Sequence, residues 1–266
     1  MRGSPARRVA AMVLRYLYLM RRSWPRLLEL AYWPTVQMVL WGFITRFLLT
    51  NSTWLVQAAG ALIAAVLLWE VLFRGQLGVS LAFMEEMHSR NLGHLFVSPL
   101  RPQELVAAFL VISLVRTLIG VGTAALLAIP LYHYSIFSMG PALVAFFACL
   151  LVMGWAIGLM VSALVLRYGL GAESMAWVAI FAVAPVSGIY YPVSVLPEWL
   201  RPVAWVLPSS HVFEGMRALL FEARFDAGLM GTALLLDALW LALGAGLFLA
   251  AFRVARRDGL LLRVGE

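Results

Sequence analysis

Long apolar segments separated by short polar connections dominate the hydropathy pattern of the chain. Each segment is long enough to cross the roughly 30 Å hydrocarbon core of a bilayer as a helix rising about 1.5 Å per residue. We expect six such spans near residues 28–50, 55–78, 105–131, 141–166, 173–190 and 229–252. The pattern therefore predicts an all-α integral membrane protein, whose second and third spans are long enough to tilt or to extend into the cytosol.

The first 26 residues follow an amphipathic pattern instead. Arg8, Arg15 and Arg22 recur every seven residues and share one helical face, with apolar side chains opposite. This pattern predicts a helix in the membrane interface with its arginines toward headgroups or a partner, and a basic tail is the alternative. The chain thus divides into an interfacial helix, residues 1–26, and one six-span transmembrane domain, residues 27–266.

Composition favours the bilayer as the solvent for this chain. It is 63% hydrophobic and 12% charged, whereas a soluble domain has about 25% charged residues. The net charge is +7, but the arginines are scattered between apolar runs and form no basic patch for nucleic acid. We therefore expect membrane lipid as its surroundings and no nucleic-acid partner.

The distribution of basic residues predicts orientation and excludes one activity. With six spans, most arginines fall on the side of both termini, and the connections at residues 51–54 and 132–140 have none. Cytosolic loops carry the excess of basic residues, so both termini should be cytosolic. The chain has no lysine, and a nucleotide-binding P-loop requires one. If ATP drives its function, another polypeptide hydrolyses it.

The connection at residues 84–104 is the most polar stretch inside the chain. Its apolar positions recur at helical spacing and predict a short amphipathic helix that ends before Pro99. Such a helix could dock into a groove on a soluble partner, or lie in the interface without one. The candidate docking residues are Glu85, Glu86, His88, Arg90, Asn91, Leu92, Leu95 and Phe96.

The connection at residues 184–226 is rich in proline and yet remains apolar and aromatic. Broken apolar backbone at membrane depth must be covered by protein or line a cavity. We therefore expect short re-entrant helices at the outer surface, with aromatic side chains at the outer mouth. The candidate residues are Tyr190, Tyr191, Pro192, Trp199, Trp205, His211, Glu214 and Arg217, of which the last three share helical spacing and predict a polar stripe.

The candidate intramembrane charges are Glu70, Arg74, Arg116 and Asp237, and Arg46 lies near the outer end of the first predicted span. Charges at membrane depth usually face a partner or a cavity. We hypothesise an interhelical pair between Glu70 and Arg116, on spans that share the cytosolic connection. In the alternative, Arg74 pairs with Glu70 four residues away and Arg116 extends to the interface.

Two segments resemble a known family. The runs LFVSPLRPQELVAA and SGIYYPVSVLPEWLRPVAWVLPSSHVFEGMRALL are similar to the corresponding segments of ABC-2-type permeases, the membrane subunits of ATP-driven exporters of drugs, polysaccharides or Nod factors. The resemblance implies that residues 84–98 form a coupling helix on an ATPase and residues 191–221 form external re-entrant helices. It also implies a second permease copy, forming a homodimer in the bacterial inner membrane, with two ATPase copies on its cytosolic face.

The same resemblance implies an amphiphilic or lipid-linked cargo, with ATP and Mg²⁺ bound by the ATPase and neither cofactor nor metal held by this chain. Two other classes stay open. A secondary transporter would need titratable residues at the midplane, for which Glu70 and Asp237 are the candidates. An intramembrane enzyme or assembly factor would need a clustered polar site, and the sequence contains neither a GxSxG nor an HExxH motif, so we name no catalytic residue.

Overall fold

The computed structural model describes residues 4–51 and 56–259 of the chain, and every regular element in these ranges is helical. The all-α prediction is therefore confirmed for this part. The predicted connection at residues 51–54 lies almost wholly outside the described residues, as do the first three residues of the expected interfacial helix and the last seven of the chain.

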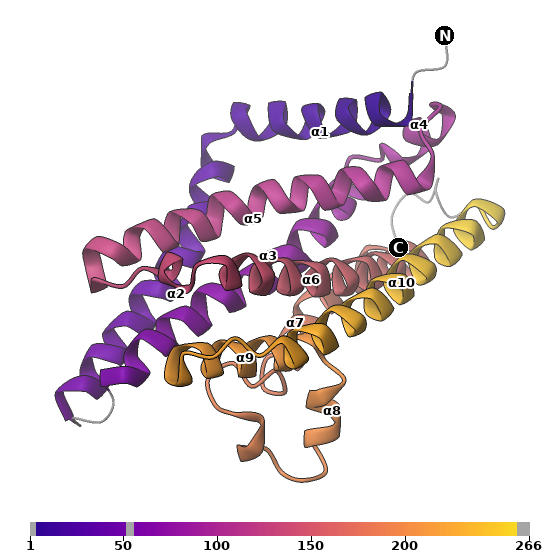
Figure 1. Ribbon diagram of the computed structural model, residues 1–266. Helices are drawn as coiled ribbons and strands as arrows, with labels where there is room; N and C mark the ends of the chain where they lie inside the picture. Colours follow the sequence, from indigo (N-terminus) through magenta and orange to yellow (C-terminus); the bar gives the residue numbers. More distant parts are fainter. Residues whose placement is uncertain (1–3, 52–55, 260–266) are drawn as a thin grey trace.

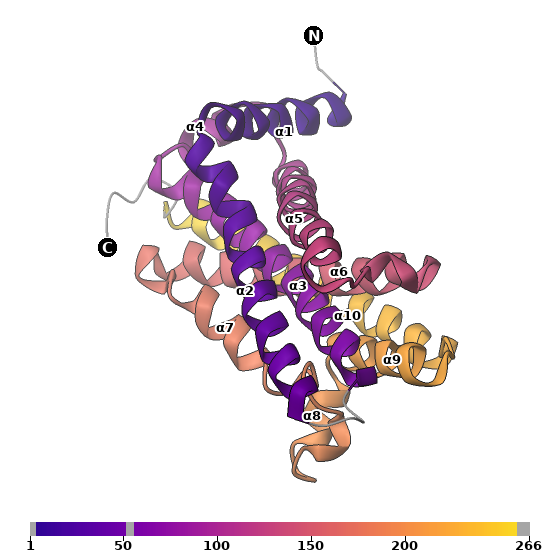
Figure 2. The ribbon, with the colours of Figure 1, turned by 90° about the vertical axis from the view of Figure 1, so that its left-hand side faces the viewer.

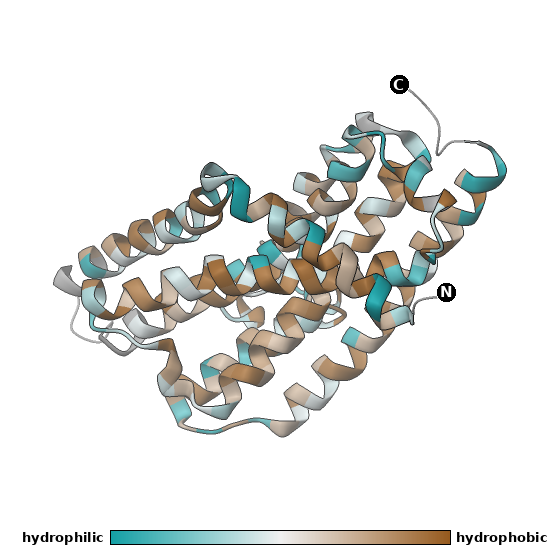
Figure 3. Ribbon diagram, turned by 90° about the horizontal axis from the view of Figure 1, so that it is seen from above, coloured by the Kyte–Doolittle hydropathy of each residue, from teal (hydrophilic) through white to brown (hydrophobic). Residues whose placement is uncertain are grey.

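Five long helices form the bundle: α2 (Trp24–Asn51), α3 (Val56–His88), α5 (Pro102–Tyr132), α6 (Pro141–Tyr168) and α10 (Ala227–Arg257). Each contains a segment long and apolar enough to cross a membrane. Figure 3 shows these helices mostly in hydrophobic colours, with hydrophilic residues concentrated toward their ends. The long second and third segments were predicted to extend beyond a span, and α3 and α5 contain 33 and 31 residues.

The predicted fifth span, residues 173–190, is not among these five helices. Its helical part, α7 (Met175–Val183), has nine residues and rises about 14 Å, which is half of the hydrocarbon core. Pro185 follows two residues later, and a proline has no amide hydrogen to continue the helix. The described chain therefore has five candidate spans, and the count of six is not confirmed.

One end of the bundle carries both the beginning and the end of the described chain (Figure 1). Helix α1 (Pro5–Arg22) lies across this end, and α4 (Leu92–Val97) and the end of α10 lie on the same side. Two ion pairs join helix ends there, Arg167 with Asp258 at 3.6 Å and His88 with Glu173 at 3.7 Å. The two ends of the described chain thus lie on one side of the bundle (Figure 1), and the cytosolic location of that side stays a prediction.

Small residues let α6 approach its neighbours closely. A side chain at Gly154 would begin 2.6 Å from the Leu72 carbonyl oxygen of α3, and one at Gly158 would begin 2.8 Å from the Gln76 oxygen. Gly244 of α10 meets the Ala156 carbonyl oxygen in the same way, at 2.6 Å. Contacts of this kind replace the hydrophobic effect as the source of helix association in lipid, so these glycines have a packing role.

The opposite end carries the connection between α7 and α10. It contains two short helices, α8 (Arg201–Trp205) and α9 (Pro208–Glu222). Figure 2 shows α1 at one extreme of the molecule and α8 at the other. Helix α9 packs against α10 and α6, so part of this proline-rich connection is buried in protein. Its re-entry into a bilayer stays a prediction.

Candidate functional site

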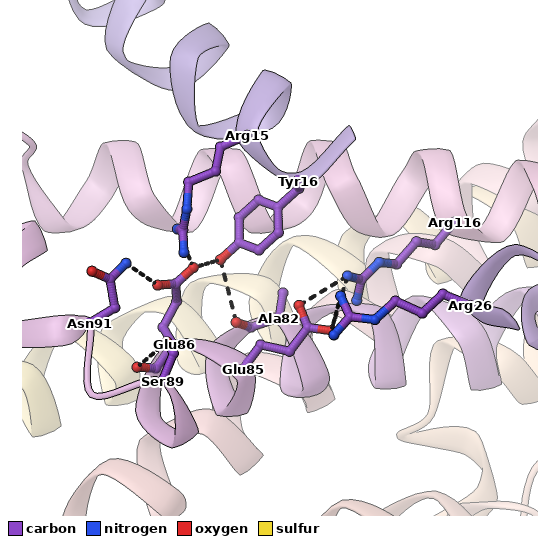
Figure 4. A network of polar contacts seen from close by, with 9 residues as sticks. All are labelled: Arg15, Tyr16, Arg26, Ala82, Glu85, Glu86, Ser89, Asn91 and Arg116. Carbon is purple, nitrogen blue, oxygen red and sulfur yellow. Dashed lines mark hydrogen bonds and ion pairs between the residues drawn. The ribbon is translucent and has the colours of Figure 1, made fainter. Parts of the chain in front are cut away.

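Glu86, near the end of α3, joins three parts of the chain that are far apart in sequence (Figure 4). Its side chain is 1% exposed and accepts hydrogen bonds from Arg15 Nη1 at 2.6 Å and Asn91 Nδ2 at 2.7 Å. The buried Tyr16 hydroxyl donates a third hydrogen bond to it. Burial, and next the Glu86 charge, raise the pKa of Tyr16 far above its ordinary value, so the phenol keeps the proton that it donates.

These hydrogen bonds determine how α1 sits on the bundle. A buried carboxylate needs donors, and hydrogen bonds to an ionised group are the stronger ones. A second pair acts at the other end of α1, where Arg8 Nε donates to Glu104 Oε2 at 2.8 Å. The predicted basic face of α1 thus directs Arg8 and Arg15 to carboxylates of the bundle itself. Because Glu86 is buried, the structure does not place it on a docking surface.

Glu85, the preceding residue, faces α5 and α2 (Figure 4). Arg116 Nη2 lies 3.2 Å from its Oε2 atom, and Arg26 Nη1 lies 3.5 Å from its Oε1 atom. The hypothesised pair between Glu70 and Arg116 is therefore wrong, and Glu70 pairs with Arg74 at 3.2 Å on the same helix. The alternative was right for Glu70 alone, because α3 continues about three turns beyond the predicted boundary at residue 78 and brings Glu85 within reach of Arg116.

A cavity of about 410 Å³ lies between α2, α3, α5 and α7. This volume is within the range of about 300–1,000 Å³ that is usual for small-molecule sites. Its lining combines six ionisable side chains, Arg26, Glu29, Glu70, Arg74, Glu85 and Arg116, with four aromatic ones, Trp33, Phe73, Trp177 and Phe181. The three guanidinium groups balance the three carboxylates in number. Such a cavity can hold a molecule with one polar and one apolar part.

Asp237 lies elsewhere. It is buried on α10 at 3% exposure and does not line this cavity. Within the described part of the chain, neither of its carboxylate oxygens receives a hydrogen bond of standard geometry. The Cys149 thiol of α6 is the polar group that faces it. The structure thus brings Glu70, Arg74 and Arg116 to one cavity and separates Asp237 from them.

At the opposite end, the predicted polar stripe of α9 holds the backbone of the preceding connection. Glu214 Oε1 accepts a hydrogen bond from the Val193 amide at 2.6 Å and pairs with Arg217 at 3.0 Å. Arg217 also donates to the Gly188 carbonyl oxygen at 2.8 Å. His211 Nε2 lies 2.9 Å from the Trp205 carbonyl oxygen. These side chains therefore fasten residues 188–205 to α9.

The aromatic residues of this connection have different surroundings. Tyr190 stacks on Trp41 of α2, with ring centroids 4.4 Å apart. The Tyr191 hydroxyl donates to the Pro185 carbonyl oxygen at 2.6 Å, and Pro192 precedes a short 3-10 turn at Val193–Val195. Trp199 is exposed, and Trp205 is partly exposed. Tyr190 thus connects this region to α2, one of the helices that line the cavity.

The predicted docking segment does form a short helix. Helix α4 ends at Val97, and Ser98 is extended with ψ 162°, as expected before Pro99. His88 and Arg90 are exposed, whereas Leu92 is buried and Leu95 is partly buried. The side chain of Phe96 lies outside the described part.

Sequence reasoning missed most of the cavity wall. Trp33, Phe73, Trp177 and Phe181 look like ordinary apolar residues in apolar segments, and no spacing distinguishes them. Arg26 and Glu29 fell at the edge of the first predicted span, where charges are common. By contrast, the seven-residue spacing of Arg8 and Arg15 did mark the α1 face that contacts the bundle.

The fold and the cavity together define a multi-pass helical membrane protein with a charged, aromatic cavity at the side of its bundle. The sequence matches the ABC-2 type transporter family over residues 8–221. The chain therefore belongs to the ABC-2 type transporter family, whose members are membrane transport components and not themselves ATPases. No curated protein matched the sequence.

Proposed function

We propose that this chain is the permease of an ATP-driven ABC-2 exporter, and that it forms part of a pathway for an amphiphilic or lipid-linked molecule such as a drug, a lipid or a glycan carrier. Family membership supports the permease role. The cavity between α2, α3, α5 and α7 is the observation that supports the substrate class, because aromatic walls suit an apolar body and paired charges suit a polar headgroup.

A second copy of the chain would complete the pathway. The candidate span in α2 has only 17% of its residues buried in this chain. Trp33 of α2 and Trp177 and Phe181 of α7 line the cavity and are also exposed. A homodimer formed through these helices would cover these rings and enclose the cavity between two copies.

The ends of α3 and α4 offer a route for coupling to ATP hydrolysis. Two copies of a separate ATPase subunit would bind ATP and Mg²⁺ and contact α4, while this chain holds no cofactor. Glu86 connects α3 to Asn91 before α4, and its neighbour Glu85 lines the cavity. A movement of α4 would thus be transmitted to the cavity through Asn91, Glu86 and Glu85. Such transmission could switch the cavity between inward and outward access.

Both ends of the described chain on one side (Figure 1 and Figure 2) require an even number of crossings, so in this proposal α7 and the residues that follow it make the sixth crossing. The arginine bias supports an orientation with both termini in the cytosol. The family likeness is the basis for proposing the bacterial inner membrane. In this orientation α4 faces the ATPase. The connection that carries α8 and α9 would then face the outside and form the outer mouth of the pathway.

Reconstitution with the ATPase encoded beside the chain tests the proposal. We expect the two subunits to co-purify and fluorescent amphiphilic dyes to stimulate ATP hydrolysis in liposomes. The variant Trp177→Ala with Phe181→Ala should lower this stimulation about tenfold, equivalent to about 1.4 kcal/mol of binding free energy. The matched control, Leu235→Ala with Leu239→Ala, changes exposed residues of α10 and should keep the stimulation.

Each failure has its own meaning. If no ATPase associates with the chain, the exporter proposal fails, and a secondary transporter or an intramembrane enzyme becomes the better account. If the ATPase associates but the cavity variant and the control behave alike, the cavity does not bind the substrate.

A further inference from the structure

The stretch from the last turn of α3 to the first turn of α5, residues 85–104, separates its charges by sign. Its carboxylates turn inward: Glu86 is buried among three donors, Glu85 pairs with Arg116 and Arg26, and the buried Glu104 pairs with Arg8. In the sequence, Glu85 and Glu86 precede the basic residues and Glu104 follows them, so residue order alone does not show which charges face outward. The exposed ionisable side chains of this stretch are therefore mainly basic.

The exposed side consists of Arg90 in the turn before α4, His94 and Val97 of α4, and Arg101 before α5; we call these four residues the basic docking face. Val97 is 91% exposed. Within the described part of the chain, neither Arg90 nor Arg101 has a carboxylate at ion-pair distance. The carboxylate nearest to Arg101 is that of Glu104, which accepts a hydrogen bond from the Arg101 amide at 3.0 Å, feels the Arg101 charge and pairs with Arg8.

An exposed apolar residue flanked by unpaired cations fits one kind of partner. Protein interfaces place apolar side chains at the centre and charges at the rim, and the potentials of the two partners are complementary. Guanidinium groups bind carboxylates with two parallel hydrogen bonds. A complementary surface on the partner would therefore carry Asp and Glu side chains around an apolar depression.

We propose that the basic docking face binds an acidic groove on the ATPase subunit, with Val97 in the groove and Arg90 and Arg101 paired with its carboxylates. This inference rests on the proposed function and adds the chemistry of the partner surface. It also removes Glu85 and Glu86 from the docking contact.

A lipid surface is a poorer match. Helix α1, at the same end of the molecule, exposes the large apolar side chains Leu14, Tyr18 and Leu19, as an interfacial helix does. The basic docking face exposes one, Val97, beside the polar Ser98 and the turn at Pro99. Too little apolar surface is available here to insert between headgroups.

Charge reversal in the whole complex tests the proposal. The variant Arg90→Glu with Arg101→Glu should weaken ATPase binding at least tenfold at low salt, and added salt should weaken wild-type binding more than variant binding. The matched control is Arg21→Glu with Arg22→Glu, which makes the same change of charge on exposed residues of α1. The control should bind within about twofold of wild type.

Cross-linking then identifies the partner surface. Cys149 is the one cysteine of the chain and is buried, so Val97→Cys introduces a single reactive thiol for a photoactivated cross-linker. We expect the cross-linked ATPase peptide to be rich in Asp and Glu, and reversing those carboxylates to Lys should restore binding to the Arg90→Glu, Arg101→Glu variant.

The outcomes separate this inference from the proposed function. If no ATPase binds at any salt concentration, the proposed function fails. If the ATPase binds but neither salt nor the double variant affects affinity, the acidic groove is wrong and the exporter proposal stands. If the variant instead loses binding to anionic vesicles and keeps the ATPase, the face is a lipid site and the inference is overturned.

Discussion

Two carboxylates in this bundle are buried to almost the same degree and have opposite surroundings. Glu86 is 1% exposed and receives hydrogen bonds from Arg15, Tyr16 and Asn91. Asp237 is 3% exposed, and in the described chain neither of its oxygens receives one of standard geometry. Burial alone therefore does not tell what a carboxylate contributes. The difference predicts that Glu86 holds helices together, whereas Asp237 does not stabilise the bundle.

The largest expected effect comes from removing the acceptor in the satisfied network. Glu86→Leu would leave the Tyr16 hydroxyl and the Asn91 amide without their acceptor, at a cost of about 2–4 kcal/mol in all. The Arg15 side chain is 37% exposed and can be solvated, so it adds little to this cost. We expect a loss of this size in the free energy of unfolding, measured by chemical denaturation in detergent.

Glu86→Gln is the matched control for this change. It keeps an oxygen acceptor and the size of the side chain, so the loss should be about 1–3 kcal/mol. A Glu86→Leu protein as stable as wild type would refute the role assigned to Glu86.

The next effect tests one donor of the same network. Tyr16→Phe removes one hydrogen bond and should lower the free energy of unfolding by about 1 kcal/mol at pH 8. The folded-state pKa of Tyr16 is raised above the ordinary value of 10.0. A raised pKa contributes stability that is complete below pH 10 and is lost as the pH rises toward the folded-state pKa.

Wild type should therefore approach the Tyr16→Phe variant by about 1.4 kcal/mol per pH unit above pH 10. Denaturation curves between pH 8 and 11 measure this difference. A constant difference over the whole range would show that Tyr16 does not titrate differently in the folded and unfolded states.

Hydropathy predicted the long helices because their apolar segments have few alternatives to the bilayer. It placed five of the spans where the structure has α2, α3, α5, α6 and α10. It did not predict that α7 ends after nine residues, because mean hydropathy over residues 173–190 does not register Pro185 and Gly188, which interrupt a helix within an apolar segment.

The candidate site was predictable only in part, for a related reason. Helical spacing showed that Arg8 and Arg15 share a face, although not that this face turns to carboxylates of the bundle. It also gave the pair of Glu70 with Arg74, but only as the alternative to the hypothesised pair of Glu70 with Arg116. The partners of Glu85 and Arg116 depend on how far α3 extends and on which helices lie beside it. The burial of the Glu86 side chain likewise depends on the position of α1 beside α3. Pairing across helices is a property of the packed bundle, and no residue spacing encodes it.

A third carboxylate, on the surface, gives a smaller effect. Asp226 precedes α10, and its Oδ1 atom accepts a hydrogen bond from the Leu229 amide at 3.0 Å. Asp226→Ala should lower the melting temperature through loss of this helix cap, and Asp226→Asn should lower it less. The Leu229 amide is the main cause that lowers the pKa of Asp226 below 3.8.

A lowered pKa contributes stability above pH 3.8 that is lost as the pH falls toward the folded-state pKa. The difference between wild type and Asp226→Ala should therefore shrink below pH 4. Thermal unfolding at pH 7 and at pH 3 measures it, and equal melting temperatures for the two proteins at pH 7 would contradict the cap.

Asp237 should respond least, and its response completes the comparison with Glu86. Asp237→Leu removes a buried polar group that forms no standard hydrogen bond in the described chain, so the free energy of unfolding should stay constant or rise by about 1 kcal/mol. Asp237→Asn, of the same size, should change it less. Both variants should keep dye-stimulated ATP hydrolysis, because Asp237 does not line the cavity.

If Asp237→Asn is as stable as wild type but loses transport, this carboxylate takes part in transport. The lack of hydrogen bonds to this carboxylate would then reflect a role in transport. Ion-coupled transport would replace ATP-driven transport as the first hypothesis for the chain.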